Sequence, residues 1–186
     1  DLVSLSFGDA SLEFNNIIIS CPQVQFTSES TIDTLTLNSG VKCIFPAGKN
    51  QYTNAFTITG TCSSPILMES DVAGFACKLN QTSGNVTGTY LYLKDITAQG
   101  GASFTATQSI DEGNVTGWTI SETLSSSDIN WIGNTGNWHD AANWSTGCIP
   151  GPADNVFFNA VSFTGNDTVF INENAYCANM DWSAAT

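Results

Sequence analysis

The sequence of 186 residues contains almost no basic side chains. Lysine and arginine together number 4, all of them lysines, against 17 aspartates and glutamates, and the formal net charge is −13. Such a surface repels phosphate groups, which argues against nucleic acid as a partner and against docking on anionic membranes. No apolar run is long enough to span a bilayer as a helix, so we expect no membrane insertion.

Residues for catalysis are equally scarce. The single histidine, His139, stands between Trp138 and Asp140 in a turn-rich stretch, which favours a packing or solvated role. A hydrolase needs a nucleophile with its base, or a paired acid and base, and no such constellation is visible. A polysaccharide lyase would use Arg or Lys to stabilise the developing charge of an acidic sugar, and no basic cluster is present. We therefore predict no catalytic residues and no enzyme activity.

The hydrophobic pattern predicts an all-β chain. Hydrophobic residues make up 41% of the sequence, enough for a packed core. No segment sustains the i, i+3, i+4, i+7 apolar spacing of a helix, whereas short β-branched and aromatic runs alternate with Thr, Ser, Asn and Gly. The predicted strands lie at residues 2–7, 16–20, 23–27, 34–37, 42–45, 55–59, 66–69, 75–79, 90–96, 103–106, 118–121, 156–159 and 168–171.

One internal similarity favours a solenoid. Residues 32–40 (IDTLTLNSG) resemble residues 52–60 (YTNAFTITG), and Leu35 then matches Phe56. An interval of about 21 residues suits one coil of a repeat whose strands stack about 4.8 Å apart. We predict a right-handed parallel β-solenoid with Leu35 and Phe56 stacked inside. A β-sandwich is the alternative, because two of its strands can resemble each other by chance.

The polar stretch 122–130 divides the chain. It lacks aromatic residues and is rich in serine, which is typical of a linker. We predict that residues 1–121 form the C-terminal part of one β-solenoid module and that residues 131–186 form the N-terminal part of the next. Both ends fall within the pattern, so we expect an excerpt from a longer repeated protein.

Two ordered sets of motifs stand on either side of this stretch. The first comprises Asp95-Ile96, Ala98, Gly100-Gly101, Phe104, Ser109, Asp111, Gly113-Asn114 and Gly117-Trp118. The second comprises Gly136-Asn137-Trp138, Asp140, Asn143-Trp144-Ser145, Cys148-Ile149-Pro150, Asp154, Val156-Phe157-Phe158, Cys177 and Met180-Asp181-Trp182. In this order they resemble the repeated modules of very long, secreted, adhesin-like surface proteins of Bacteroidetes-type bacteria, which are typically exported by the type nine secretion system.

The resemblance implies tandem β-solenoid modules without enzyme activity. The chain would then be a structural segment of a modular extracellular adhesin or surface filament, with neighbouring repeats as its partners. A carbohydrate-binding module of a secreted protein, with surface glycans as partners, is the rival hypothesis. The resemblance also suggests O-glycosylation at Thr34 and Thr168, since Asp33-Thr34-Leu35 and Asp167-Thr168-Val169 match an Asp-Ser/Thr-apolar pattern.

Six cysteines with few charges indicate an oxidising, extracellular setting. None forms a C-x-x-C motif, so disulfides are a better interpretation than a zinc site. We predict a Cys21–Cys43 bridge between stacked coils and a Cys62–Cys77 bridge that closes a short apolar excursion. A third bridge, Cys148–Cys177, is predicted within the second unit, where the resemblance places a cysteine at each point. Buried, reduced thiols are the alternative.

Two groups of residues are candidate ligand sites, each with a structural alternative. Trp131, Trp138 and Trp144 could present aromatic faces to a sugar, or they could cover the end of a solenoid. No cofactor is expected apart from calcium, which wants carboxylate and carbonyl oxygens. The calcium candidates are Asp140, Asp154 and Asn155, for which the alternative is capping of turns near Pro150 and Pro152.

Overall fold

The computed structural model describes residues 2–5, 13–121 and 126–185, and it divides the chain into two compact units. Unit 1 comprises Asp1–Thr61 and Pro65–Glu122, whereas unit 2 comprises Cys62–Ser64 and Thr123–Thr186. Within the described residues, no helix is long and apolar enough to cross a membrane.

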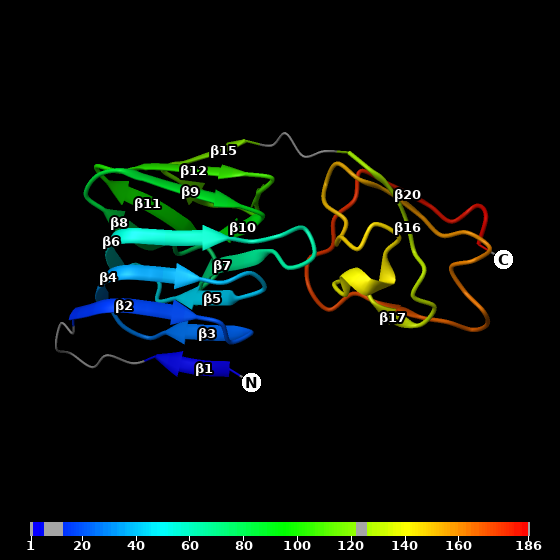
Figure 1. The fold of residues 1–186 in the computed structure, drawn as a ribbon, viewed down its shortest axis with the longest axis horizontal. Coiled ribbons are helices and arrows are strands. Elements are labelled where there is room, and N and C mark those ends of the chain that lie inside the picture. Colours follow the sequence, from blue (N-terminus) through cyan, green and yellow to red (C-terminus); the bar gives the residue numbers. More distant parts are fainter. Residues whose placement is uncertain (1, 6–12, 122–125, 186) are drawn as a thin grey trace. The chain divides into compact units, whose positions relative to one another are not determined.

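One sheet of unit 1 is a ladder of six parallel strands, one from each successive coil (Figure 1). Side chains along these strands alternate between the interior and the outside, as β-strand geometry requires. The predicted parallel solenoid is therefore confirmed, and the β-sandwich alternative is wrong. The strands are, in stacking order, β1 (Leu2–Leu5), β3 (Gln23–Phe26), β5 (Lys42–Phe45), β7 (Ile66–Ser70), β10 (Leu91–Lys94) and β13 (Ile110–Asp111).

The second sheet of unit 1 divides in two at the long strand β6 (Asn50–Thr59). Before it, β2 (Glu13–Ile19) and β4 (Ser30–Leu37) pair in parallel along most of their lengths. The first half of β6 then pairs with β8 and its end pairs with β9, so later coils have three sides where earlier coils have two. The two branches are β8 (Cys77–Gln81), β11 (Ile96–Gly100) and β14 (Val115–Thr116), and β9 (Asn85–Thr89), β12 (Ser103–Thr107) and β15 (Trp118–Ser121).

The internal similarity seen in the sequence corresponds to neighbouring coils. Leu35 of β4 lies opposite Phe56 of β6, and both side chains are buried, as predicted. Strand β9 was not predicted, because its sequence NVTGT directs only Val86 and Gly88 inward. A Cβ atom at Gly88 would force the buried Leu91 side chain to shift.

Corners of successive coils repeat a left-handed backbone conformation. Gly74, Asp95 and Asn114 have φ angles of +82°, +54° and +55°, a region that Gly, Asn and Asp adopt more readily than other residues. The Asp95 side chain is buried and accepts hydrogen bonds from the Gly74 N–H at 3.0 Å and from Asn114 Nδ2 at 2.7 Å. The carboxylate thus connects corners of three coils.

The interior of unit 1 is a continuous column of apolar side chains. Each fully buried Leu, Ile or Phe contributes about 1.5–3 kcal/mol relative to leaving it exposed. The large side chains that are fully buried in this column include Phe26, Ile32, Leu35, Leu37, Phe45, Ile58, Ile66 and Met68.

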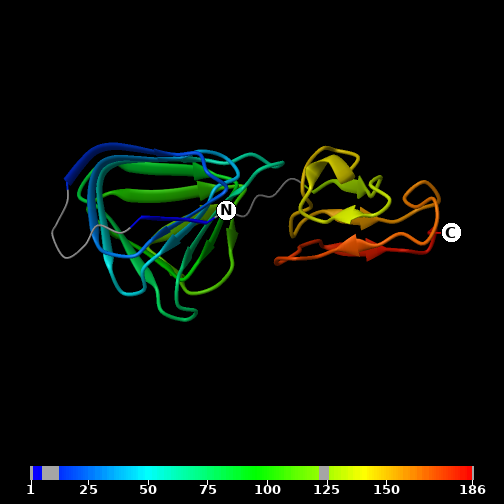
Figure 2. The same cartoon turned by 90° about the horizontal axis from the view of Figure 1, so that it is seen from below.

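Unit 2 repeats the parallel arrangement with fewer strands, which Figure 2 shows in yellow to red, one above another. Its three-stranded sheet has the order β16 (Asp128–Asn130), β18 (Asn155–Phe157) and β20 (Asn179–Asp181). A second pair is formed by β17 (Gly136–Asn137) and β19 (Val169–Phe170), and η1 (Ala141–Asn143) is a 3-10 helix. The predicted linker 122–130 is wrong at its end, because Asp128–Asn130 form β16; residues 122–125 lie outside the described residues.

Candidate interaction site

The three strands of the unit 2 sheet carry the same four-residue pattern, in register. They read Asp128-Ile129-Asn130-Trp131, Asn155-Val156-Phe157-Phe158 and Asn179-Met180-Asp181-Trp182. Each begins with Asp or Asn, continues with an aliphatic residue and ends with an aromatic residue. The sequence shows these segments plainly, but only the register reveals that they stack.

The first position of the pattern forms a hydrogen-bonded ladder on one face of the sheet. Asn155 Nδ2 donates to Asp128 Oδ1 at 2.9 Å, and Asn179 Nδ2 donates to Asn155 Oδ1 at 2.9 Å. The ladder therefore has a direction, because each amide donates to the strand before it. Unit 1 contains a similar ladder in which Asn80 donates to Asn50 and Gln99 donates to Asn80.

The second and fourth positions point into the core, but only the first two strands are covered. Ile129 and Val156 are 1% and 0% exposed, whereas Met180 is 45% exposed. Trp131 and Phe158 are 0% and 1% exposed, whereas Trp182 of the last strand is 48% exposed. Strand β20 thus presents core-type side chains to solvent. We call this surface, formed by Asn179–Trp182, the open end.

A pocket of about 330 Å³ adjoins the open end. Trp182 stacks on Phe158, with ring centroids 3.7 Å apart, so the Phe158 ring covers one face of the indole. A hydrogen bond from the Thr135 hydroxyl, assisted by backbone N–H groups of the 164–165 turn, lowers the pKa of Asp167, which favours its ionised form. The pocket is lined by Phe163, Gly165, Asn166, Asp167, Val169, Trp182 and Ala185.

The three tryptophans that were candidates for a sugar surface lie in the core instead. Trp131, Trp138 and Trp144 are at most 1% exposed. Trp144 contacts both others edge-to-face, with centroids 4.9 and 4.8 Å apart, and its Nε1 donates to the Trp138 carbonyl at 2.7 Å. The ligand-surface hypothesis for these rings is wrong, because their faces are covered by one another. Among the tryptophans that the structure describes, Trp182 is exposed, at 48%, and it was not among the predicted ligand residues.

The calcium candidates serve as turn and ladder residues. Asp140 caps η1 by accepting a hydrogen bond from the Ala142 N–H at 3.0 Å, and Asp154 accepts from the Gly151 N–H at 2.8 Å. Asn155 belongs to the amide ladder. Among the described residues, no group of three or more His, Cys, Asp or Glu side chains could hold a metal ion. The turn-capping alternative therefore describes both aspartates.

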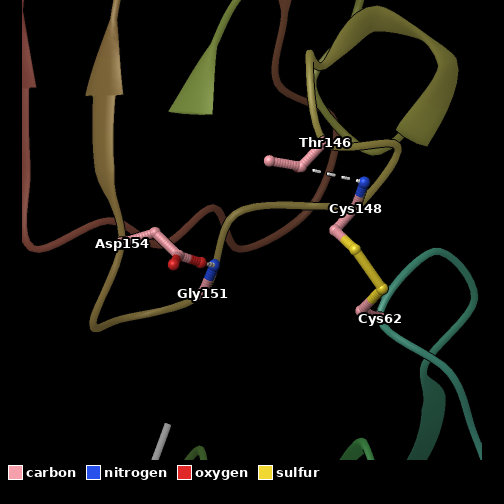
Figure 3. The surroundings of a disulfide bond; sticks show 5 residues. All are labelled: Cys62, Thr146, Cys148, Gly151 and Asp154. Atoms are coloured by element: carbon pink, nitrogen blue, oxygen red, sulfur yellow. Dashed lines mark hydrogen bonds between the residues drawn. A yellow bond between two sulfur atoms is a disulfide. The ribbon is translucent and has the colours of Figure 1, made fainter. Parts of the chain in front are cut away.

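The predicted disulfide pairs are wrong. Cys62 bonds to Cys148, and Figure 3 shows this bond beside the 146–154 turn; the Ile149 N–H also donates to the Cys62 carbonyl at 3.1 Å. The segment Cys62–Ser64 belongs to unit 2, although it interrupts the sequence of unit 1. Cys21, Cys43, Cys77 and Cys177 are free thiols.

Strand register explains why the expected partners do not meet. Cys43 lies opposite Val24 rather than Cys21, because Cys21 precedes β3 in a turn. Cys77 lies opposite Ile96, as a buried core residue of β8. Burial raises the pKa of the Cys77 thiol to about 12 and that of Cys43 well above its ordinary value, which suppresses thiolate formation.

The remaining candidates are at the surface or partly buried. His139 is exposed at its ring nitrogen, where Nε2 lies 3.0 Å from the Asn174 carbonyl oxygen. Thr34 is half-buried within β4, and Thr168 is exposed immediately before β19. Thr168 is thus the more accessible of the two predicted O-glycosylation sites.

Comparisons of the chain with protein-family models, curated proteins and solved structures found no match.

Proposed function

We propose that the chain is a non-catalytic structural segment of a modular extracellular adhesin or surface filament. The observation that carries this proposal is the in-register stacking of coils in both units, reinforced by directional amide ladders. Such a solenoid can be lengthened one coil at a time, because each coil contacts only its neighbours. That property suits a repeated, extended surface protein.

Two further features support an extracellular structural role. The Cys62–Cys148 disulfide is of a kind that persists in oxidising compartments. The net charge of −13 favours solubility and disfavours self-association through electrostatic attraction. The resemblance to the repeated modules of Bacteroidetes-type surface proteins also supports the proposal, because modules of that kind occur in tandem.

The proposal can be tested on the gene that encodes the parent protein and on intact cells that produce it. We expect its product to contain further segments with the Asx-aliphatic-x-aromatic pattern, and we expect protease treatment of intact cells to release fragments of this chain. A product without further copies, or one that is protected from external protease, would contradict the proposal.

A carbohydrate-binding module is the second candidate, and the pocket beside Trp182 favours it. A half-exposed indole, together with the Asn166 and Asp167 side chains, suits the apolar and hydroxyl surfaces of a neutral sugar. A glycan array would decide: selective binding that is lost in Trp182→Ala supports this candidate, and uniform absence of binding removes it.

A further inference from the structure

Threonines form two adjacent columns on the outer face of unit 1. They come from the end of β6 and from β9, β12 and β15, in the segments TIT, TGT, TAT and TIS. Figure 1 shows these four strands side by side. Because alternate residues of a strand point to the same side, the first and third residues of each segment share one face. We call this surface the hydroxyl array; it comprises Thr57, Thr59, Thr87, Thr89, Thr105, Thr107, Thr119 and Ser121.

Strand register aligns the hydroxyl array in two directions. The first column runs through Thr57, Thr87, Thr105 and Thr119, and the second runs through Thr59, Thr89, Thr107 and Ser121. Neighbouring strands of a sheet lie about 4.8 Å apart, and alternate residues of one parallel strand lie about 6.6 Å apart. The hydroxyl groups therefore repeat as a two-dimensional lattice with these two intervals.

The side chains of the hydroxyl array have little freedom to move. Ile58, Gly88 and Ala106, which separate the two columns, are buried in the interior and hold the strands in place. Threonine is branched at Cβ, which restricts rotation about χ1. In addition, the hydroxyls of Thr89 and Thr105 donate to backbone carbonyl oxygens of the preceding coil at 3.4 Å. The face thus presents methyl and hydroxyl groups at fixed, regular positions.

This face is uncharged, although the chain has a net charge of −13. Within the described strands β9, β12 and β15, no residue is acidic or basic. The other branch differs, because Lys78 lies on β8. An uncharged lattice of hydroxyls favours a neutral ligand whose own hydrogen-bonding groups repeat at the same intervals.

We propose that the hydroxyl array binds the surface of an ice crystal. This inference rests on the proposed function, because it gives the proposed adhesin a target surface. On the prism faces of hexagonal ice, oxygen atoms repeat at two perpendicular distances close to those of the array. Each ice oxygen donates and accepts hydrogen bonds, as a threonine hydroxyl does. Because the array is already ordered, little further ordering is needed when water molecules on it join the lattice.

Slow freezing of a dilute solution of the full chain tests the proposal, since a growing ice front excludes solutes that do not bind it. We expect the chain to be about tenfold more concentrated in the ice than its Thr105→Tyr variant, because many weak contacts of one rigid surface act together. Thr105 lies on β12, between β9 and β15, and a bulky ring there would keep its neighbours from the crystal.

The matched control is Thr97→Tyr, which should enter the ice as the unaltered chain does. Thr97 is also half-buried and lies on β11, the middle strand of the other branch. Thr107→Tyr, at an exposed position of the second column, provides a second test in case Thr105→Tyr does not fold. Near-ultraviolet circular dichroism verifies the fold of each variant. Exclusion of the unaltered chain from ice, or equal incorporation of the folded array variants, would overturn the inference.

Other occupants of this face would give different results. Binding to a crystalline polysaccharide powder with exclusion from ice would assign the array to a carbohydrate surface. Association that depends on protein concentration, with exclusion from ice, would assign it to a second copy of the chain. Either result overturns the inference. Exclusion from ice by a chain whose parent has tandem copies would remove this inference alone, whereas binding to ice without tandem copies would support it and remove only the proposed function.

Discussion

Replacement of Trp144 by alanine should unfold the core of unit 2 more effectively than any surface substitution. The indole is 1% exposed and lies within 5 Å, centroid to centroid, of both Trp131 and Trp138. Its Nε1–H also satisfies the Trp138 carbonyl oxygen. Alanine would remove the ring, leave a cavity among the remaining aromatics and deprive this carbonyl of its donor.

The expected loss follows from these contacts. Truncation of a buried Trp to Ala costs about 3–5 kcal/mol, and an unsatisfied buried acceptor adds about 1–3 kcal/mol unless water reaches it. We therefore expect Trp144→Ala to lower the free energy of unfolding by about 4–8 kcal/mol. This is comparable to the whole stability of a small domain. Trp144→Phe, which keeps most of the ring volume but lacks the N–H, should lose about 1–3 kcal/mol.

Urea unfolding followed by tryptophan fluorescence and near-ultraviolet circular dichroism would measure these losses. The matched control is Trp182→Ala, because this ring is about half exposed and should cost only about 1–2 kcal/mol. A loss below about 2 kcal/mol for Trp144→Ala, or one no greater than the loss for Trp182→Ala, would refute the assignment of Trp144 to the core.

Three further results are expected. Replacing Cys62 with Ser should lower the free energy of unfolding under non-reducing conditions by about 4 kcal/mol, because Cys62 and Cys148 close a loop of 86 residues; an unchanged unfolding midpoint would contradict this. Burial raises the Cys77 pKa from 9.0 to about 12. The neutral thiol therefore contributes fully to the free energy of unfolding below pH 9. Between pH 9 and pH 12 this contribution falls by about 1.4 kcal/mol per pH unit, because the thiol ionises in the unfolded chain but not in the folded one. Alkaline unfolding curves of Cys77→Ala should have a shallower slope, because only the contribution of the buried Cys43 thiol remains, and a slope identical to that of the original chain would refute the explanation. Asn155→Asp should destabilise unit 2 by about 1 kcal/mol at pH 7, because it removes a donor and places a carboxylate beside Asp128. Protonation near pH 3 should recover part of this loss, and thermal melting at the two pH values would check it.

The class of fold could be predicted from sequence patterns alone. Short β-branched runs without helical spacing predicted the all-β chain, and the match between Leu35 and Phe56 predicted parallel coils, because residues that stack in a solenoid repeat at the interval of one coil. Strands with a single inward apolar residue, such as β9, escaped prediction because one residue does not establish an alternation.

Positions that depend on strand register could be assigned only from the three-dimensional structure. Coil length varies, so Cys43 falls opposite Val24 and not opposite Cys21, and Cys62 reaches Cys148 from a segment grouped with unit 2. The sequence likewise drew attention to Trp131, Trp138 and Trp144 as possible ligand residues. It did not show that these three rings cover one another, or that Trp182 is half exposed. Whether an aromatic ring is core or surface depends on whether another coil covers it, which no local pattern records. Trp144 and Trp182 occur in similar sequence surroundings, but Trp144 is covered by Trp131 and Trp138 whereas Trp182 follows the last strand of the sheet and is 48% exposed.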